Sequence, residues 1–420
     1  MSFQQGLSGL SAASQNLDVV GNNIANANTV GYKQSRAEFT DILANSLGGG
    51  GASRVGIGAK VATVSQSFDQ GNISPTSNPL DMAINGQGFF RFDEQGVISY
   101  SRNGQFRLDN SGYLVSSSGA NLTGYAADAT GAIDASKPVN LKLTTTDLPP
   151  KVTTEFEWGF TLDSNQPVPA VPTFSALDGH SYTHTKSATI YDSLGNPHAL
   201  AIYFQKTATP GTWETFATVD GKTDASGLPV GITLDGGASA TLTFDGKGDM
   251  TSPAAPLAVS VDLSAIDSTL GADTPLDFTL DLTTTKQYGS GFNVNLNNQD
   301  GYAASHLAGF SALETGEIQG IYSNGKSKTI GQIVLANFVN PQGLAPIGEG
   351  RWVESQTSGQ PLVGEPKSGT LGVLQSSAVE DANVDLTTEL VKMITAQRMY
   401  QANAKTIETQ DSIMQTIVNI

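Results

Sequence analysis

The clearest hydrophobic pattern lies near the C-terminus, where an apolar residue recurs at every seventh position from Val379 to Met414. In three of these repeats a second apolar residue follows four positions later. This heptad spacing predicts one face of a long helix. Neither Gly nor Pro interrupts Leu386–Ile420, so nothing in the backbone stops that helix. A lone helix of this kind cannot bury its stripe, and it therefore needs a partner.

A matching repeat at the N-terminus supplies the expected partner, with an apolar residue every seven positions from Phe3 to Ile24. Small residues such as Gly6 and Gly9 interrupt it and make it a poor autonomous coiled coil. The termini are expected to form an α-helical coiled coil. Its helices either dock on a globular core or become ordered only when many chains pack together. The residues expected to form the helical seams of the assembly interface are Phe3, Leu7, Leu10, Leu17, Ile24, Val379, Leu386, Leu390, Met393, Tyr400, Ile407 and Met414.

The segment after the first helix is rich in residues that break helices. Asn and Gly dominate Gly21–Lys33, which predicts a helix end followed by an irregular turn. A second short helix is expected over Ser35–Leu47. It is followed by four glycines, Gly48–Gly51, which predict a flexible tether.

The middle of the chain alternates apolar and polar residues with the period of strands, and Asn-Gly pairs such as Asn85-Gly86 mark hairpins. From about Thr144 the composition changes, and the Phe/Tyr/Gly style of the first β region returns at Gly301-Tyr302, which indicates one β domain inserted into another. The predicted fold is a multidomain α+β chain with paired terminal helices and two nested, mainly antiparallel all-β domains. The expected boundaries are 1–30 with 375–420 for the helices, 31–71 with 363–374 for Gly/Ser-rich linkers, 72–146 with 298–362 for the first β domain, and 147–297 for the inserted one.

Composition excludes several function classes. The chain of 420 residues has a formal net charge of −17, which argues against a nucleic-acid partner. It contains no Cys, so thiolate metal sites and thiol nucleophiles are excluded. We expect no membrane insertion, because no apolar run approaches the length of a membrane span, and no cleavable signal peptide.

Apparent chemical motifs have simpler explanations. Gly320–Ser327 matches the phosphate-binding P-loop, but the residues after it indicate a strand, and Asn324-Gly325 is a hairpin signal. Asp245–Asp249 lacks the later ligands of a calcium loop and is also expected to be a turn. His180 and His184 lie in a strand-like setting without a metal motif. We therefore expect no catalytic, cofactor-binding or metal-binding residues, and no enzyme activity.

Two terminal motifs resemble those of the bacterial flagellar axial proteins, which form the rod, the hook and the hook-associated segments. Asn383–Ala404 is similar to the C-terminal signature of that family, and Asn78–Phe90 resembles the β domain shared by its rod and hook members. The inserted region around Ala188–His198, together with Tyr322–Gly325, favours a hook over a rod protein. The N-terminal signature turn comprises Asn22, Asn23, Asn26, Asn28, Thr29, Gly31 and Tyr32.

The resemblance implies a hook subunit that polymerises into a curved hollow tube, a universal joint that transmits motor torque to the filament. It also implies as partners the chain itself, the distal rod protein, the hook cap protein, the hook–filament junction protein and the flagellar export apparatus. The location implied is the extracellular hook of the flagellum. A distal rod or other axial protein, a phage-tail-like or surface-layer protein and a secreted enzyme are the alternatives. A chain that still polymerises after loss of both termini would favour the phage-tail-like or surface-layer protein. Substrate turnover would favour the secreted enzyme.

Overall fold

The computed structural model describes the backbone of residues 2–42, 56, 58–128, 130–143, 146–267, 269 and 271–418. The chain divides into two compact units. Its terminal helices, with mainly antiparallel sheets between them, confirm the predicted fold class. Unit 1 comprises Met1–Thr145, Ala308–Ile321 and Lys326–Ile420, and unit 2 comprises Thr146–Leu307 and Tyr322–Gly325.

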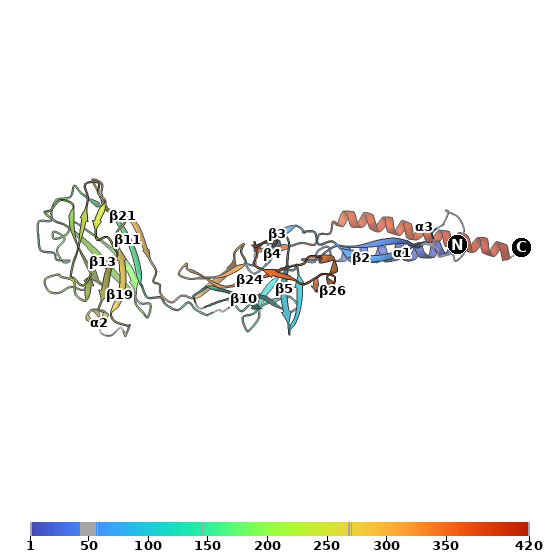
Figure 1. Ribbon diagram of the computed structural model, residues 1–420, viewed down its shortest axis with the longest axis horizontal. Helices are drawn as coiled ribbons and strands as arrows, with labels where there is room; N and C mark the ends of the chain where they lie inside the picture. Colours follow the sequence, from blue (N-terminus) through green and yellow to red (C-terminus); the bar gives the residue numbers. More distant parts are fainter. Residues whose placement is uncertain are drawn as a thin grey trace. The chain divides into compact units, whose positions relative to one another are not determined.

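Two long helices belong to unit 1 and lie side by side (Figure 1). Helix α1 spans Ser2–Ala25 and helix α3 spans Leu386–Val418. The Asp385 carboxylate accepts a hydrogen bond from the Thr388 amide at 2.9 Å, which caps the beginning of α3. Among the described residues, no helix has the length and apolar character that a membrane span requires.

The predicted helical stripe begins too early in the sequence. Val379 lies in strand β30 (Ala378–Glu380), which pairs antiparallel with β3 (Ile73–Pro75), so its assignment to a helical seam is wrong. Its side chain is buried in unit 1. The pairing with β3 satisfies the backbone of this segment, and the helix starts only after the Asp385 cap.

The segment after α1 forms strands where a helix was expected. Ser35–Ile42 is strand β1, which pairs antiparallel with β2 (Gly58–Gln66), so the helix predicted over Ser35–Leu47 is wrong for its described residues. Both strands contact α1, and the buried side chain of Ala37 shows that tertiary packing outweighs local helix propensity here. Residues 43–47 and the predicted tether Gly48–Gly51 lie outside the described residues.

The β part of unit 1 is closed by strands from both halves of the chain. β3 pairs with β30, and β4 pairs with β29, so the chain entering this region is paired with the chain leaving it. Phe90, Leu335 and Leu374 lie in its main core. The remaining strands and the short 3-10 helix are β4 (Met82–Asn85), β5 (Phe89–Glu94), β6 (Val97–Ser101), β7 (Phe106–Leu108), β8 (Leu114–Ser116), β9 (Asn121–Ala127), β10 (Ile133–Asn140), β22 (Leu307–Ala312), β23 (Glu317–Tyr322), β24 (Ser327–Ile333), β25 (Leu335–Asn337), η1 (Pro341–Gly343), β26 (Ala345–Gly348), β27 (Arg351–Val353), β28 (Leu362–Gly364) and β29 (Val373–Ser376).

Unit 2 contains two sheets with one shared core. One sheet has the order β15-β18-β19-β11-β20 with β21 beside β11, and the other has the order β12-β13-β14-β16-β17. Trp158 from the first sheet and Trp213 from the second are both fully buried in that core. The elements are β11 (Glu155–Asp163), β12 (His184–Tyr191), β13 (Pro197–Lys206), β14 (Thr212–Val219), β15 (Ile232–Leu234), β16 (Ala240–Phe244), β17 (Met250–Ser252), β18 (Leu257–Val261), α2 (Leu263–Ile266), β19 (Leu276–Asp281), β20 (Lys286–Tyr288) and β21 (Asn293–Gln299).

The two apparent ligand motifs are turns, as the sequence predicts. β23 and β24 pair antiparallel on either side of the P-loop-like motif, and Gly325 in that turn has a φ of 76°. In the Asp245–Asp249 turn between β16 and β17, the Asp245 carboxylate accepts hydrogen bonds from the amides of Lys247 and Asp249, each at 2.8 Å. The carboxylate that would bind calcium thus holds the turn.

Candidate functional site

Small residues on α1 allow α3 to approach closely. Gly6, Gly9 and Ala13 follow one another at spacings of three and four residues, which places them on one helix face. A Cβ atom on Gly6 would lie 3.0 Å from Thr406 Oγ1, and one on Gly9 would lie 2.8 Å from Asn403 Oδ1. The residues that interrupt the predicted apolar stripe therefore form the contact surface with α3.

The face of α3 turned toward α1 shares only part of the predicted stripe. Leu390, predicted as a seam residue, is 48% exposed, whereas Ala396 is 1% exposed. Ala396 lies three positions after Met393, whereas the predicted second row lies four positions after the first. The buried and half-buried residues of α3 are Glu389, Met393, Ala396, Asn403, Ala404, Ile407 and Gln410.

Most predicted seam residues remain partly or largely exposed in the single chain. Leu10, Leu17, Ile24, Met393 and Ile407 are half-buried. The exposed ones are Phe3, Leu7, Leu386, Leu390, Tyr400 and Met414, and the sequence analysis did not single out four further exposed apolar residues of α3, Val391, Ile394, Met399 and Ile413. Apolar side chains gathered on one helix pair at this density indicate a surface that a partner covers.

The signature turn after α1 is organised around Asn23. Its side chain is buried; the amide Nδ2 donates to the Ser35 carbonyl at 2.8 Å, and Oδ1 accepts from the Ser35 amide at 2.9 Å. The Tyr32 hydroxyl donates to Asn23 Oδ1 at 3.1 Å and to Asn22 Oδ1 at 3.0 Å. Burial raises the pKa of Tyr32 above its ordinary value. These contacts fix the direction in which the chain leaves α1.

Other signature residues complete this turn. The Asn26 side chain donates to the Asn22 carbonyl at 3.0 Å, and the Thr29 hydroxyl donates to Asn26 Oδ1 at 3.3 Å, while Asn28 is exposed. Gly31 has a φ of 73°, and a Cβ there would lie 2.5 Å from the backbone nitrogen of Asn103. Only glycine fits that position without moving the backbone of the β core.

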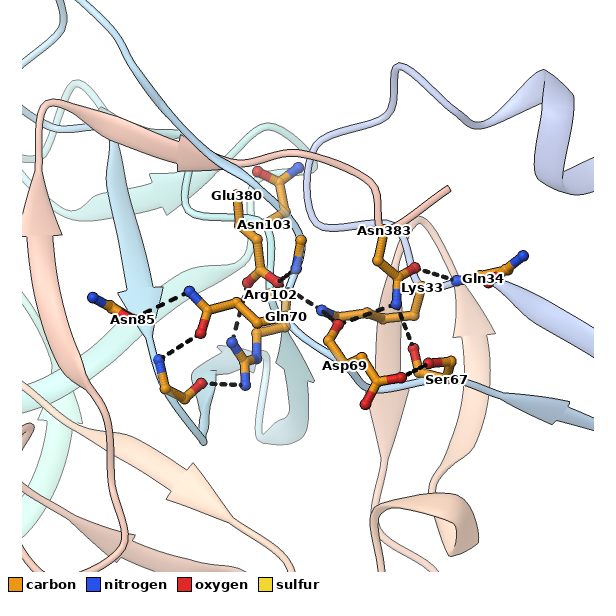
Figure 2. A network of polar contacts seen from close by, with 12 residues as sticks. Lys33, Gln34, Ser67, Asp69, Gln70, Asn85, Arg102, Asn103, Glu380 and Asn383 are labelled. Carbon is orange, nitrogen blue, oxygen red and sulfur yellow. Dashed lines mark hydrogen bonds and ion pairs between the residues drawn. The ribbon is translucent and has the colours of Figure 1, made fainter. Parts of the chain in front are cut away.

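Next to the turn, Glu380 joins three parts of unit 1 through a buried ion-pair cluster (Figure 2). The Lys33 ammonium donates to Glu380 Oε1 at 2.6 Å, and the Arg102 guanidinium donates to Glu380 Oε2 at 3.1 Å. Glu380 Oε1 also accepts from the Gly71 amide at 2.8 Å. The side chains of Glu380 and Lys33 are both 0% exposed and that of Arg102 is 4% exposed, so two cations share one carboxylate away from water.

Burial opposes the charge on both cations. It lowers the pKa of Lys33 and of Arg102 below their ordinary values, and the Glu380 carboxylate partly offsets this in each case. Backbone carbonyls accept from two further donors, because Lys33 donates to Asp69 O at 2.8 Å and Arg102 donates to Gly86 O at 2.9 Å, while the buried Arg102 Nε makes no hydrogen bond within the described residues. Without Glu380 both cations would be left buried without a carboxylate.

A second buried carboxylate connects this junction to α3. Glu389 Oε1 accepts from Gln34 Nε2 and from Lys392 Nζ, each at 2.6 Å, and Glu389 Oε2 accepts from Asn23 Nδ2 at 3.1 Å. Asn383 Oδ1 accepts from the Gln34 amide at 2.7 Å. The first turn of α3 is therefore fixed to the end of α1 and to the chain that follows it.

Glu380, Arg102 and Glu389 were not predicted to be functional. Lys33 directly follows the signature turn, but no charge pattern connects it to the other two, because Arg102 and Glu380 are 278 residues apart in the sequence. One signal was present: Glu380 directly follows the apolar pair Ala378-Val379 at a strand position. An acid beside such residues indicates a buried, paired carboxylate.

The histidines that the sequence analysis weighed as metal ligands have other surroundings. His184 lies in β12 and stacks on Phe292 with ring centroids 4.5 Å apart, and burial lowers its pKa. Within the described part of the chain, no group of three or more His, Asp or Glu side chains is placed to hold a metal ion.

Four stretches of the sequence match families of flagellar proteins, and together they include most of the chain. Residues 3–33 match the flagella basal body rod protein family, 83–152 the flagellar hook protein FlgE/F/G D1 domain, 161–302 the flagellar basal body protein FlaE D2 domain, and 375–420 the flagellar basal body rod FlgEFG protein C-terminal family.

Relatives that match over the full length show which kind of flagellar protein the chain is similar to. The chain is 40% identical over 424 residues to the flagellar hook protein FlgE of Escherichia coli K12, with 100% of both chains covered. It is 31% identical over 445 residues to the FlgE of Borreliella burgdorferi, with 100% of this chain and 99% of the relative covered. These relatives are hook proteins, so the distal-rod alternative is not favoured.

The crystal structure of the Helicobacter pylori flagellar hook protein FlgE2 matches with a TM-score of 0.51. The match covers 73% of this chain and 100% of the other at 14% identity, and it supports the fold alone. The full-length identities carry the assignment: the chain belongs to the flagellar hook protein family and is a structural subunit of the hook.

Proposed function

We propose that this chain polymerises through its terminal helices into a curved hollow tube that acts as a universal joint, transmitting motor torque to the filament. The observation that carries the proposal is the row of exposed apolar side chains on α1 and α3, helices that are already packed against each other in one chain. Buried apolar area is the main favourable term in association, and neighbouring copies can supply it.

In this proposal the paired helices α1 and α3 line the channel, and the segments 31–71 and 363–374 connect the terminal regions to the β regions. The described parts of these connecting segments contain strands β1, β2 and β28. The ion-pair cluster around Glu380 and the hydrogen bonds of Asn23 join the helices to the β core. Torque applied to the β core would therefore reach the helices through buried charged contacts.

The distal rod protein, the hook cap protein and the hook–filament junction protein are the proposed neighbours of the polymer. We further propose that the flagellar export apparatus delivers the chain to the extracellular hook. Family membership supports these proposals, since hook proteins assemble within the flagellum.

Leu390→Asp or Tyr400→Asp is expected to abolish assembly while leaving both units folded. Leu390 and Tyr400 are 48% and 39% exposed in the single chain, so an aspartate there remains hydrated in the monomer. In a polymer seam an unpaired carboxylate would cost several kcal/mol, repeated at every subunit. Sedimentation and electron microscopy measure assembly, and circular dichroism measures folding.

Leu390→Met and Tyr400→Phe are the matched controls, because they keep an apolar side chain of similar size at the same two positions. Both are expected to retain assembly. Normal tubes from the Leu390→Asp and Tyr400→Asp variants would show that this apolar row is not an interface.

Removal of the inserted region, about 147–297, is expected to give tubes that still assemble but are straighter. The two chain segments at its base are adjacent, because the amides and carbonyls of Leu148 and Ser305 exchange hydrogen bonds at 2.9 and 3.1 Å. A short Gly/Ser bridge can therefore close the parent domain. We propose that the region lies at large radius, where bending changes subunit spacing most. Electron micrographs measure the curvature.

Two outcomes would contradict the role in curvature. One is a set of tubes with unchanged curvature. The other is a deletion variant that remains folded, as judged by circular dichroism, yet fails to assemble. A variant with the same Gly/Ser insertion placed between Leu148 and Pro149, and with nothing deleted, controls for the bridge itself.

A further inference from the structure

An open apolar groove lies where α1, α3 and the β1–β2 sheet meet. Its volume is about 470 Å³, and all four elements belong to unit 1. Most of its lining residues have small side chains, while Phe39 and Met399 form apolar walls. The other lining residues are Gly9, Ala12, Ala13, Asn16, Ala59, Ala402 and Asn403. Small residues between larger walls make a hole into which branched aliphatic side chains fit.

Helix α3, which forms one wall of the groove, carries a matching apolar ridge on its other side. Leu386, Leu390 and Ile394 are spaced four residues apart and are each about half exposed, so they form one row along α3. At about 100° per residue, this row points roughly away from the side that Met399 and Ala402 present to the groove. The row spans about 12 Å of helix, close to the length of the groove wall from Gly9 to Asn16.

We propose that the groove of one subunit receives the Leu386, Leu390 and Ile394 ridge of a second copy of this chain. A groove and a ridge on opposite sides of one helix cannot pack against each other within a subunit. They also cannot pair in a closed two-fold dimer that uses a single self-complementary patch, so the contact repeats from copy to copy. The inference rests on the proposed polymerisation and assigns the partner and the contact surface.

The positions on α3 also fix the offset between neighbours. The ridge is centred near Leu390 and the α3 wall of the groove near Gln401, which is 11 residues further along the helix. At 1.5 Å per residue this corresponds to an axial shift of about 16 Å between subunits in contact. No charged residue lines the groove or forms the ridge, so the contact is uncharged on both sides and mainly apolar.

Disulfide crosslinking of assembled, full-length protein tests this contact. The chain has no Cys, so a Leu390→Cys, Ala402→Cys double variant carries the only two thiols. On oxidation of the tubes we expect a ladder of covalent oligomers, because the ridge and groove positions of adjacent copies come within disulfide range. Leu390→Cys with Gln415→Cys is the matched control, since Gln415 is exposed on α3 and lies 13 residues beyond Ala402, and it is expected to remain monomeric.

A second variant tests the groove without thiols. Ala402→Phe fills the groove from an exposed position, so it is expected to keep the monomer's circular dichroism spectrum and to lose at least tenfold in the amount of sedimentable polymer. Tubes that form normally from Ala402→Phe, or a ladder of equal yield from the Gln415 control, would overturn the groove contact while leaving polymerisation intact. Absence of tubes from the unaltered chain would overturn the proposed function as well.

Discussion

Replacement of Glu380 by alanine is expected to open the junction of unit 1 while unit 2 remains folded. The change leaves the Lys33 and Arg102 cations buried without their carboxylate, and breaking a buried pair in this way costs about 3–5 kcal/mol. Amide hydrogen exchange of peptides covering Gly31–Ser35 and Ala378–Asp381 should accelerate by a hundredfold or more. Peptides from the core of unit 2 should exchange at the rate of the unaltered chain.

Glu314→Ala is the matched control for this experiment. Glu314 also pairs with a lysine, Lys367, but both side chains are largely exposed, and such pairs contribute little to stability. A second comparison replaces Lys33, Arg102 and Glu380 together by Met, Met and Leu. Removing all three charges should restore much of the lost protection, because no buried charge is left unpaired. Equal exchange in Glu380→Ala and Glu314→Ala would contradict the role assigned to the cluster.

Gly9→Leu is expected to separate α3 from α1, at a cost of about 1–3 kcal/mol for an overpacked contact, and to prevent assembly. The reason is steric, because the first added carbon would already lie within 2.9 Å of the Asn403 side chain atoms. Hydrogen exchange around Ala396–Ile407 measures the docking of α3, and sedimentation measures assembly.

Gly21→Leu provides the control on the same helix. Nothing lies within 4 Å of a Cβ atom built on Gly21, so this variant gains the same helix propensity, up to about 1 kcal/mol, without the clash. It should therefore dock α3 at least as well as the unaltered chain. If Gly9→Leu docked α3 equally well, the close glycine contact would not define the helix pair.

The sequence was sufficient to predict elements whose local pattern agrees with their environment. The alternating pattern in the middle of the chain corresponds to strands such as β14 and β16, and the predicted turn at Asp245–Asp249 carries its own side-chain hydrogen bonds. Both terminal helices were predicted as well, since their heptads and the absence of Gly and Pro in the second are local signals.

Elements that depend on distant contacts were missed. The helical pattern of Ser35–Ile42 gave way to a strand because β2 and α1 pack on it. The seam of the helix pair was assigned to large apolar residues, whereas close packing uses Gly6 and Gly9, which look like interruptions when one helix is considered alone. The Glu380 cluster could not be predicted, because its partners are far apart in the sequence.

The most direct test of the account is an electron cryomicroscopy map of the tube that the purified, full-length chain forms. The account predicts a hollow polymer in which α1 and α3 line the channel and in which Leu390 and Tyr400, exposed in the single chain, are buried between copies. A polymer whose copies touch only through their β-sheet regions, with α1 and α3 in contact with no other copy, would contradict this account.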